Sequence, residues 1–508
     1  MTHTGHWTTI ILHLPHLSAA LDNGDKSMIR KIALYGAMAL ACAMCATPTL
    51  AHDADHNVPP WQEATAWPDR VIATFEADPA TSLAVSWRTI ASVSASRAEI
   101  ALATPDARFD LTARSISAQS EIVDLAKTII GGADIAIPSN DKLPAVAYHS
   151  VRFDDLRPDT LYAYRVMGAD GLWSEWFQTR TAPLSGPVRF IYMGDAQNGV
   201  LSLWSRTIRA AYQAAPDARF MLHAGDLVNR ASRDTEWAEW FKAGGFLHAM
   251  VPAIPVTGNH EYDMAAPGET ERVRLLSHLW RPQFRLPVDT TLPSALHETA
   301  YAVRYSADLD VFVLDSNQRD MAPQAAWLDA QLKASKKRWR IVTMHHPVFS
   351  SGKDRDNKPN RDLLLPILTR HNVDLVLQGH DHTYARGLLD ASAQLPRRSE
   401  FKVGDALTTM FVNSVSGPKQ YEFRKEGWDD YAPTGVKLER QGENGQFFQV
   451  IGIDGNRLTY TAYTADGVQY DAAIIEKRGN TKRLIKNDKD APPTRRFENT
   501  LPYKSPNF

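Results

Sequence analysis

The sequence predicts an all-β sandwich over about residues 67–183, followed by an α/β domain over about residues 187–475. In the first part, short β-rich runs recur between turn signals such as Arg157-Pro158-Asp159, a spacing that is typical of sandwiches. In the second part, compact apolar runs alternate with helical patterns, which predicts mainly parallel strands. The chain has 508 residues, of which 44% are hydrophobic, so both parts can bury a core.

An export signal precedes the folded parts. Arg30 and Lys31 form a short basic region, residues 32–46 are apolar and small, and residues 49–51 fit a small-x-small cleavage pattern. The apolar stretch is too short to span a bilayer comfortably, although an uncleaved anchor is the alternative interpretation. We therefore expect a signal peptide over residues 28–51 and a secreted or periplasmic protein with no membrane span after cleavage.

Charge and cysteine usage restrict the function classes. Lys and Arg total 56 against 58 Asp and Glu, a balance that carries no nucleic-acid-binding signature. The only cysteines, Cys42 and Cys45, lie inside the predicted signal, so the mature chain would have no disulfide. Any metal site must then use His, Asp, Asn or Glu side chains. Residues 478–508 are predicted to form a polar C-terminal tail.

Five compact apolar runs of the second part predict buried strands. These runs are residues 188–193, 220–223, 311–315, 339–344 and 373–378. Helical patterns over residues 203–212 and 363–368 lie between them, with Leu203 and Leu363 among the residues expected on buried faces. Hairpin turns join further strands between residues 408 and 475.

Side chains with metal-binding chemistry follow four of these strands and a shorter apolar run at residues 253–256. The segments are Gly194-Asp195-Ala196-Gln197, Gly225-Asp226-Leu227-Val228-Asn229, Gly258-Asn259-His260-Glu261, His345-His346-Pro347 and Gly379-His380-Asp381-His382. We expect them to converge, because the carboxyl ends of the strands in an open α/β sheet face one crevice. Carboxylate, imidazole and amide oxygen suit Zn, Fe and Mn. Two such cations about 3.5–4 Å apart can clamp the attacking and leaving oxygens of a phosphoryl transfer.

The first part also resembles a known module. Trp87, residues 156–164 and residues 173–179 are similar to the fibronectin type III-like domain that precedes the catalytic domain in purple acid phosphatases. The resemblance implies a structural sandwich in which no catalytic residue is visible.

The five polar segments, in this order, resemble the signature of the calcineurin-like metallophosphoesterases. With the β-module in front, the chain resembles their purple acid phosphatase branch over about residues 67–475. The resemblance implies a β-sandwich flanked by helices and two metal ions, held as follows: Asp195 and His382 on the first, Asn259, His345 and His380 on the second, and Asp226 bridging both. It also implies that a metal-bound hydroxide attacks phosphorus while His260, as general acid, protonates the leaving oxygen.

Two positions depart from the families' patterns. Purple acid phosphatases carry a tyrosine three residues after the bridging aspartate, where this chain has Asn229. Other metallophosphoesterases carry a histidine two residues after the first aspartate, where this chain has Gln197. Asn229, Gln197 or water could complete the first site. Because a neutral oxygen ligand favours a divalent ion, we expect Zn, Mn or Fe(II) rather than Fe(III).

Several neighbouring residues are secondary candidates. His346, Lys353 and Arg355 are candidate substrate contacts, since they follow the ligand His345 in a region that contacts substrate in the resembling family. We interpret His223 as a core or supporting histidine, and Arg386 as a buried ion-pair partner. The long segment 263–299 is a candidate wall of the cleft.

The resulting hypothesis is an enzyme that hydrolyses small-molecule phosphate esters, as an acid phosphatase-like phosphomonoesterase. A phosphodiesterase or nucleotide hydrolase with the same metal core remains an alternative, because the loops that select the substrate follow no readable pattern. A non-catalytic secreted binding protein is the alternative from another class, and the complete set of candidate ligands argues against it.

Overall fold

The computed structural model describes residues 60–130, 133–265, 273–390, 407–479, 481–486 and 494–496. The predicted signal peptide, residues 28–51, lies outside these ranges, so export stays a prediction. Within the described ranges, no helix is both long enough and apolar enough to cross a membrane.

The N-terminal domain is a sandwich of antiparallel strands. Its strands are β1 (Asp69–Thr74), β2 (Leu83–Ile90), β3 (Arg97–Leu102), β4 (Arg114–Ser117), β5 (Gln119–Val123), β6 (Lys127–Ile130), β7 (Ala133–Ala136), β8 (Val146–Phe153), β9 (Leu161–Val166) and β10 (Phe177–Arg180). One layer has the order β1-β2-β8-β5 and the other β10-β9-β3-β4, while β6 and β7 form a separate hairpin. Val85, Trp87, Phe153 and Tyr164 fill the space between the layers and are fully or almost fully buried.

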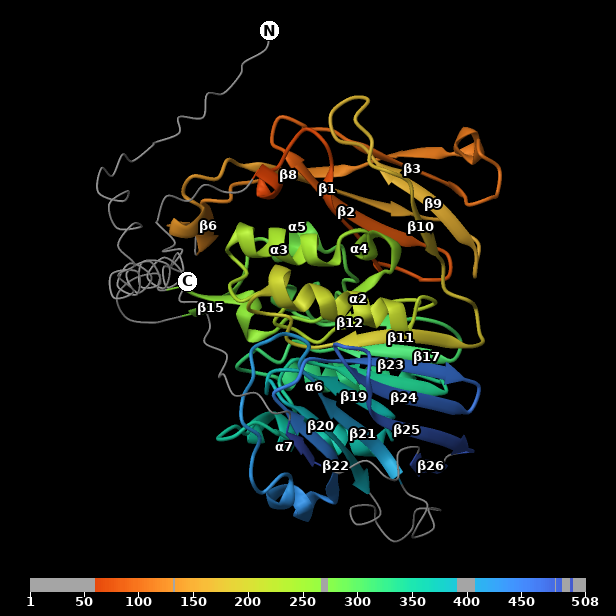
Figure 1. Cartoon of the computed structure of the whole chain (residues 1–508), viewed down its shortest axis with the longest axis vertical. Helices are drawn as coiled ribbons and strands as arrows, with labels where there is room; N and C mark the ends of the chain where they lie inside the picture. Colours follow the sequence, from red (N-terminus) through yellow and green to blue (C-terminus); the bar gives the residue numbers. More distant parts are fainter. Residues whose placement is uncertain are drawn as a thin grey trace, which may run out of the picture. The chain divides into compact units, whose positions relative to one another are not determined.

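The second domain contains two packed sheets (Figure 1). The first sheet comprises β26 (Thr481–Lys486), β25 (Gln469–Arg478), β24 (Arg457–Thr464), β23 (Phe447–Asp454), β11 (Val188–Met193), β12 (Met221–His223) and β13 (Ala253–Pro255). The second comprises β16 (Tyr301–Arg304), β17 (Leu309–Val313), β18 (Trp339–Thr343), β19 (Leu375–Gln378), β21 (Leu407–Asn413), β20 (Tyr384–Asp390), β22 (Val436–Glu443) and β27 (Thr494–Arg496). The runs β11-β12-β13 and β17-β18-β19-β21 are parallel.

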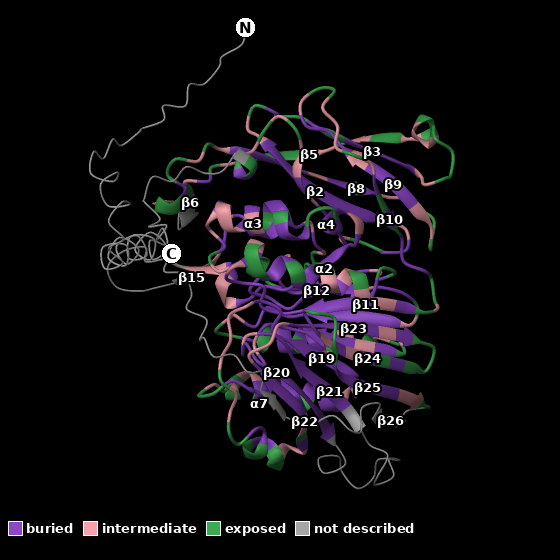
Figure 2. Cartoon of the chain, in the orientation of Figure 1, coloured by how far each residue is buried: buried purple, intermediate pink, exposed green. Residues whose placement is uncertain are grey.

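Alternation along β17 shows how the layers are built. Val311 and Val313 belong to the core between the two sheets, whereas Phe312 points to the outer face. Helices cover the outer faces of the two sheets: α2 (Ser205–Ala214), α3 (Asp234–Gly244), α4 (Phe246–Met250), α5 (Trp280–Gln283), α6 (Ala322–Ala334) and α7 (Lys358–Arg370). Figure 2 shows the central strands β11, β19 and β21 as buried over most of their length. The result is the predicted β-sandwich flanked by helices.

Two helical residues predicted to be buried are not. Leu203 is 39% exposed because it lies in a π-helical turn, Val200–Trp204, whose wider spacing shifts the register ahead of α2. Leu363 is 36% exposed because the buried face of α7 is set by Leu364 and Leu368, one position further round the helix.

The two domains share one continuous sheet. β1 of the N-terminal domain pairs in parallel with β13 through Thr74 and Ala253. The interface also buries Asp234, at the start of α3, whose carboxylate lies 2.7 Å from Arg70 Nη1 and 3.0 Å from Arg88 Nη1. The N-terminal domain is therefore fixed to the part of the catalytic domain that follows β12.

The first sheet runs beyond the predicted domain end at residue 475. β26 pairs with β25, and the buried Lys482 ammonium donates hydrogen bonds to the carbonyls of Asn372 and Val373. It also forms an ion pair with Asp374 at 2.8 Å. The polar residues from 478 onward predicted a tail, but Lys482 is buried there and anchors β26, because two carbonyls and the Asp374 carboxylate compensate its charge.

Candidate metal centre

All the predicted ligand segments follow strands of the two parallel runs. The ligands come after β11 (Asp195), β12 (Asp226), β13 (Asn259), β18 (His345) and β19 (His380 and His382). Parallel strands end at the same edge, so the two sheets bring these side chains to one place.

The first group of ligand atoms comes from Asp195, Asp226 and His382, which lie within 4.8 Å of one another. His382 Nε2 is 3.5 Å from Asp195 Oδ1. The Gln197 amide lies in the same place, with Nε2 at 2.8 Å from Asp226 Oδ2 and 2.9 Å from His382 Nε2. All four side chains are buried.

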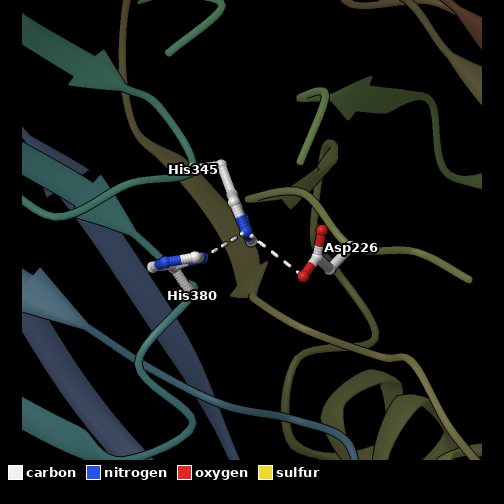
Figure 3. Close-up of side chains that lie close together, drawn as sticks. All are labelled: Asp226, His345 and His380. Atoms are coloured by element: carbon white, nitrogen blue, oxygen red, sulfur yellow. Dashed lines mark hydrogen bonds and ion pairs between the residues drawn. The ribbon is translucent and has the colours of Figure 1, made fainter. Parts of the chain in front are cut away.

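The second group comes from Asp226, His345 and His380, which converge in Figure 3. His345 Nε2 lies 3.2 Å from Asp226 Oδ2 and 3.2 Å from His380 Nδ1. Asn259 Oδ1 lies 3.2 Å from the same His345 nitrogen. Asp226 is therefore common to both groups.

The hydrogen bonds of the imidazoles indicate that both groups fit cations. His345 Nδ1 donates to the Ala224 carbonyl at 2.9 Å, and His382 Nδ1 donates to the Lys419 carbonyl at 2.8 Å. In the neutral rings, each Nε2 then directs a lone pair at a carboxylate oxygen, which also offers only lone pairs. A cation between them would relieve the repulsion of the lone pairs, and metal ligands have this arrangement.

The pKa values of His345 and Asp195 are also shifted by the close approach of these buried groups. Burial lowers the pKa of His345, but the charges of Asp226 and Asp195 and the hydrogen bonds of the ring together raise that pKa to about 9. Burial, together with the charge of Asp226, raises the pKa of Asp195 to about 8, although His345 opposes the shift. A cation in the site would relieve both costs, since it stabilises the carboxylates and takes the place of the imidazole proton.

Two glycines allow the ligands to approach the neighbouring backbone. A Cβ at Gly258 would lie 2.2 Å from Asp226 Oδ1, and a Cβ at Gly379 would lie 2.4 Å from Asp195 Oδ2. Glu261 fixes the backbone of the same region, because its carboxylate accepts hydrogen bonds from the backbone N–H groups of Asp226 and Gly258 at 2.8 and 2.7 Å. The predicted signature contained Glu261, but its role as a backbone acceptor has no sequence signal.

His260 lies beside the ligands. Its Nδ1 donates to the Asn229 carbonyl at 2.5 Å, and its Nε2 lies 3.9 Å from Asp226 Oδ2. Its side chain is 25% exposed, whereas that of Asp226 is 1% exposed. His260 therefore faces the opening of the site.

The secondary candidates occupy different places. The ring of His346 packs against that of His380, with 4.2 Å between the ring centres. Its Nδ1 forms a hydrogen bond with Ser316 Oγ at 2.9 Å. Arg355 donates to the His380 carbonyl at 3.0 Å. Lys353 instead pairs with Glu422 at 2.9 Å, with both side chains more than half exposed, and lies apart from the ligand groups.

Two further residues have the surroundings that the sequence predicts. His223 is buried between Trp204, Trp240 and His248 in the core, as the sequence analysis interpreted it. Arg386 forms the predicted buried ion pair, with Asp471 at 2.6 Å.

Tyr421 was not a candidate, because it follows β21 in an irregular segment with no motif. Its ring packs 4.5 Å from that of His382, and the Arg355 guanidinium lies 4.6 Å from its centre. Tyr421 therefore forms part of the wall on the His382 side of the centre.

A groove of about 810 Å³ opens next to His260 and Asn259. The predicted wall segment contributes to it through β14 (Tyr262–Ala265) and β15 (Val273–Leu276), which pair with each other. The N-terminal domain supplies the opposite wall, through residues 135–139. No sequence pattern indicated that this domain reaches the site.

Comparisons with known proteins identify relatives of both domains. Residues 188–384 match the calcineurin-like phosphoesterase family, and residues 68–181 match the purple acid phosphatase N-terminal domain. The chain is 28% identical to purple acid phosphatase 21 of Arabidopsis thaliana over 249 residues, which cover 47% of this chain and 53% of that protein. It is 27% identical to the Fe(3+)-Zn(2+) purple acid phosphatase 12 of the same plant, over 47% and 52% of the two chains. The matched region thus spans about half the length of these relatives.

The fold has a solved counterpart. The structure of purple acid phosphatase PPD1 from yellow lupin (Lupinus luteus) seeds superposes with a TM-score of 0.64 at 16% identity, covering 81% of this chain and 75% of that one. This likeness establishes the two-domain fold. Residues 188–384 therefore form a calcineurin-like phosphoesterase domain, and residues 68–181 form a purple acid phosphatase N-terminal domain.

Proposed function

We propose that this chain is a metal-dependent phosphomonoesterase with a dinuclear centre. The observation that carries the proposal is the position of Asp226, whose carboxylate belongs to both groups of ligand atoms. A shared carboxylate is what two adjacent cations require, and an isolated structural ion would need only one group. The named relatives are phosphatases, which supports the same reaction class.

The ligand sets follow from the contacts. Asp195, Asp226 and His382 would hold the first ion, and Asp226, Asn259, His345 and His380 the second. When bound, the ions would lower the pKa of a water molecule and neutralise charge on the phosphoryl oxygens.

Gln197 is the proposed fourth ligand of the first ion. Its buried Oε1 has no hydrogen-bond partner, and a half-turn of the amide directs that oxygen to the place now taken by Nε2. Asn229 supports the site in another way, since its main-chain carbonyl accepts a hydrogen bond that orients His260.

The residues of the chain would carry the remaining steps. A water oxygen forms a bond to phosphorus while the bond from phosphorus to the ester oxygen breaks, and the electron pair leaves with that oxygen. His260 donates its Nε2 proton to the leaving oxygen, while its Nδ1–H remains hydrogen-bonded to the main-chain carbonyl of Asn229. The products are orthophosphate and the free alcohol, and His260 regains its proton from solvent.

The ions are proposed to be divalent, with Zn, Mn and Fe(II) as candidates. Asn229 and Gln197 offer neutral groups at the first site, so its carboxylates are the only anionic ligands that the described residues supply there. This departs from the metal pair in the name of the Fe(3+)-Zn(2+) relative.

A chelation experiment tests the function. Protein stripped of metal should hydrolyse p-nitrophenyl phosphate at the background rate and recover with Zn or Mn. Asp226→Asn should prevent recovery, because it removes the charge that both ions share. Asp329→Asn is the matched control, since that carboxylate is at the surface in ion pairs with Arg370 and His371. Full activity of the stripped protein, or full recovery of Asp226→Asn, would contradict the proposal.

A further inference from the structure

The groove beside His260 has a composition suited to a particular leaving group. Among its described lining residues are three arginines, Arg230, Arg233 and Arg274, against the single carboxylate of Asp263. Burial raises the pKa of Asp263, an effect that Ser232 and Arg230 oppose in part. The groove is therefore a basic surface next to the proposed acid.

The three arginines differ in their surroundings. Arg233 lies 3.5 Å from Glu236, one turn along α3, so its charge is largely balanced. Arg230 neighbours Asp263. Arg274, on β15, is exposed and lines the groove. Among the described residues, no carboxylate forms an ion pair with Arg274, which is thus the arginine of the groove best placed to bind an anion.

The opposite wall is apolar and comes from the N-terminal domain. Ile135, Ile137 and Pro138 line the groove there. The adjacent Asn140 is fully buried and fixes this wall, because its Nδ2 donates at 2.7 Å both to Leu125 O of its own domain and to Ser232 O of the catalytic domain. Asn140 therefore ties this wall to the catalytic domain.

From these observations we propose that the groove is a subsite for a leaving group with an apolar body and its own negative charge, and that Arg274 is its specificity-determining residue. The proposal rests on the proposed phosphomonoesterase function. The apolar body would pack against Ile137 and Pro138, and the anionic end would meet Arg274. The substrate class is a phosphomonoester of an anionic aryl alcohol or one of similar shape.

The geometry explains why the charge belongs to the leaving group. His260 lines the groove, and a proton donor has to face the oxygen that departs. Whatever extends from that oxygen therefore enters the groove, whereas the transferred phosphoryl group stays at the metal ligands. For 4-carboxyphenyl phosphate, water attacks phosphorus, the bond to the phenolic oxygen breaks, and His260 protonates that oxygen. The products are orthophosphate and 4-hydroxybenzoate.

A matched pair of substrates tests the subsite on the metal-loaded, full-length protein. The wild type should hydrolyse 4-carboxyphenyl phosphate with a higher kcat/KM than phenyl phosphate. Arg274→Gln should lower kcat/KM for the carboxylated substrate by about 10-fold or more, the effect of losing one hydrogen bond to a charged group. Phenyl phosphate should change by less than about twofold. Arg209→Gln, an exposed arginine of α2, is the control and should change neither.

A binding measurement separates the subsite from the catalytic proposal. Isothermal titration with 4-hydroxybenzoate should give weaker binding to Arg274→Gln than to the wild type, with phenol as the uncharged reference. Arg274-dependent binding without any hydrolysis would support the subsite and overturn the proposed function. The subsite would be overturned if Arg274→Gln lowered kcat/KM equally for both substrates or for neither. It would also be overturned if 4-hydroxybenzoate bound equally well to the wild type and to Arg274→Gln.

Discussion

Replacement of His260 is the most direct test of how the site works. Its Nδ1 is fixed by the Asn229 carbonyl at 2.5 Å, and its Nε2, 3.9 Å from Asp226, faces the opening. His260→Ala removes a positioned proton donor, whose effect is typically about 10²–10⁴-fold. At about 1.36 kcal/mol for each tenfold change, this is roughly 2.7–5.4 kcal/mol of transition-state stabilisation.

The assay separates this role from metal binding. Alkyl phosphates should show the full loss in kcat, because their leaving oxygens need the proton most. p-Nitrophenyl phosphate should lose much less, and the metal content should stay at two ions per chain. His371→Ala, which replaces a partly buried histidine that pairs with Asp329, is the control and should retain wild-type rates. An equal loss for both leaving groups, or loss of metal, would refute the assignment of His260 as the acid.

Three further predictions concern the metal pair and the stability of the fold. The metal-loaded protein should lack an intense visible band, because Asn229 offers no phenolate and the Tyr192 hydroxyl is bonded to the main chain; a strong band in the absorption spectrum would contradict this. Asp234→Ala should lower the free energy of unfolding by about 3–5 kcal/mol in urea, since it leaves the buried Arg70 guanidinium without its carboxylate and Arg88 with Asp69 alone; a change below about 1 kcal/mol would show that the interface reorganises. Burial lowers the pKa values of His223 and His248 to about 3 and about 4, so between about pH 6.5 and pH 4 the unfolded chain binds protons that the folded chain does not. Stability should therefore fall as the pH drops through that range, by about 2 kcal/mol per histidine at about pH 5, and urea titrations of His248→Asn should show a smaller fall.

The ligands could be predicted because each depends on local order along the chain. An apolar run followed by Gly-Asp or Gly-His gives a buried strand and a polar side chain at its carboxyl end, and parallel pairing then brings the ends together. Asp195, Asp226 and His345 lie after β11, β12 and β18 for this reason. The order of these segments also sufficed to identify the family, whose models match residues 68–181 and 188–384.

Contacts between distant segments could not be predicted in this way. The pairing of β1 with β13 joins residues far apart in the chain, and neither strand differs in composition from an ordinary edge strand. The packing of Tyr421 on His382 depends on the path of an irregular segment. The proposal of Gln197 rather than Asn229 as a ligand rests on the contacts of the Gln197 amide with Asp226 and His382, which residue type alone does not determine.

The backbone at the centre distinguishes an active site from a structural relic. Asp195, Asp226, His380 and His382 have φ values of 47°, 51°, 76° and 51°, in the left-handed region that side chains with a Cβ rarely adopt. Each position costs up to about 1–2 kcal/mol, and less for Asp than for bulkier side chains, so the four together offset part of the net stability of about 5–15 kcal/mol of a typical domain. Glycine would relieve each position, but it would also remove a ligand. A protein that used this domain only as a scaffold would gain stability by such replacements. The retention of four ligand side chains in strained conformations therefore argues for a working metal centre and against the non-catalytic alternative.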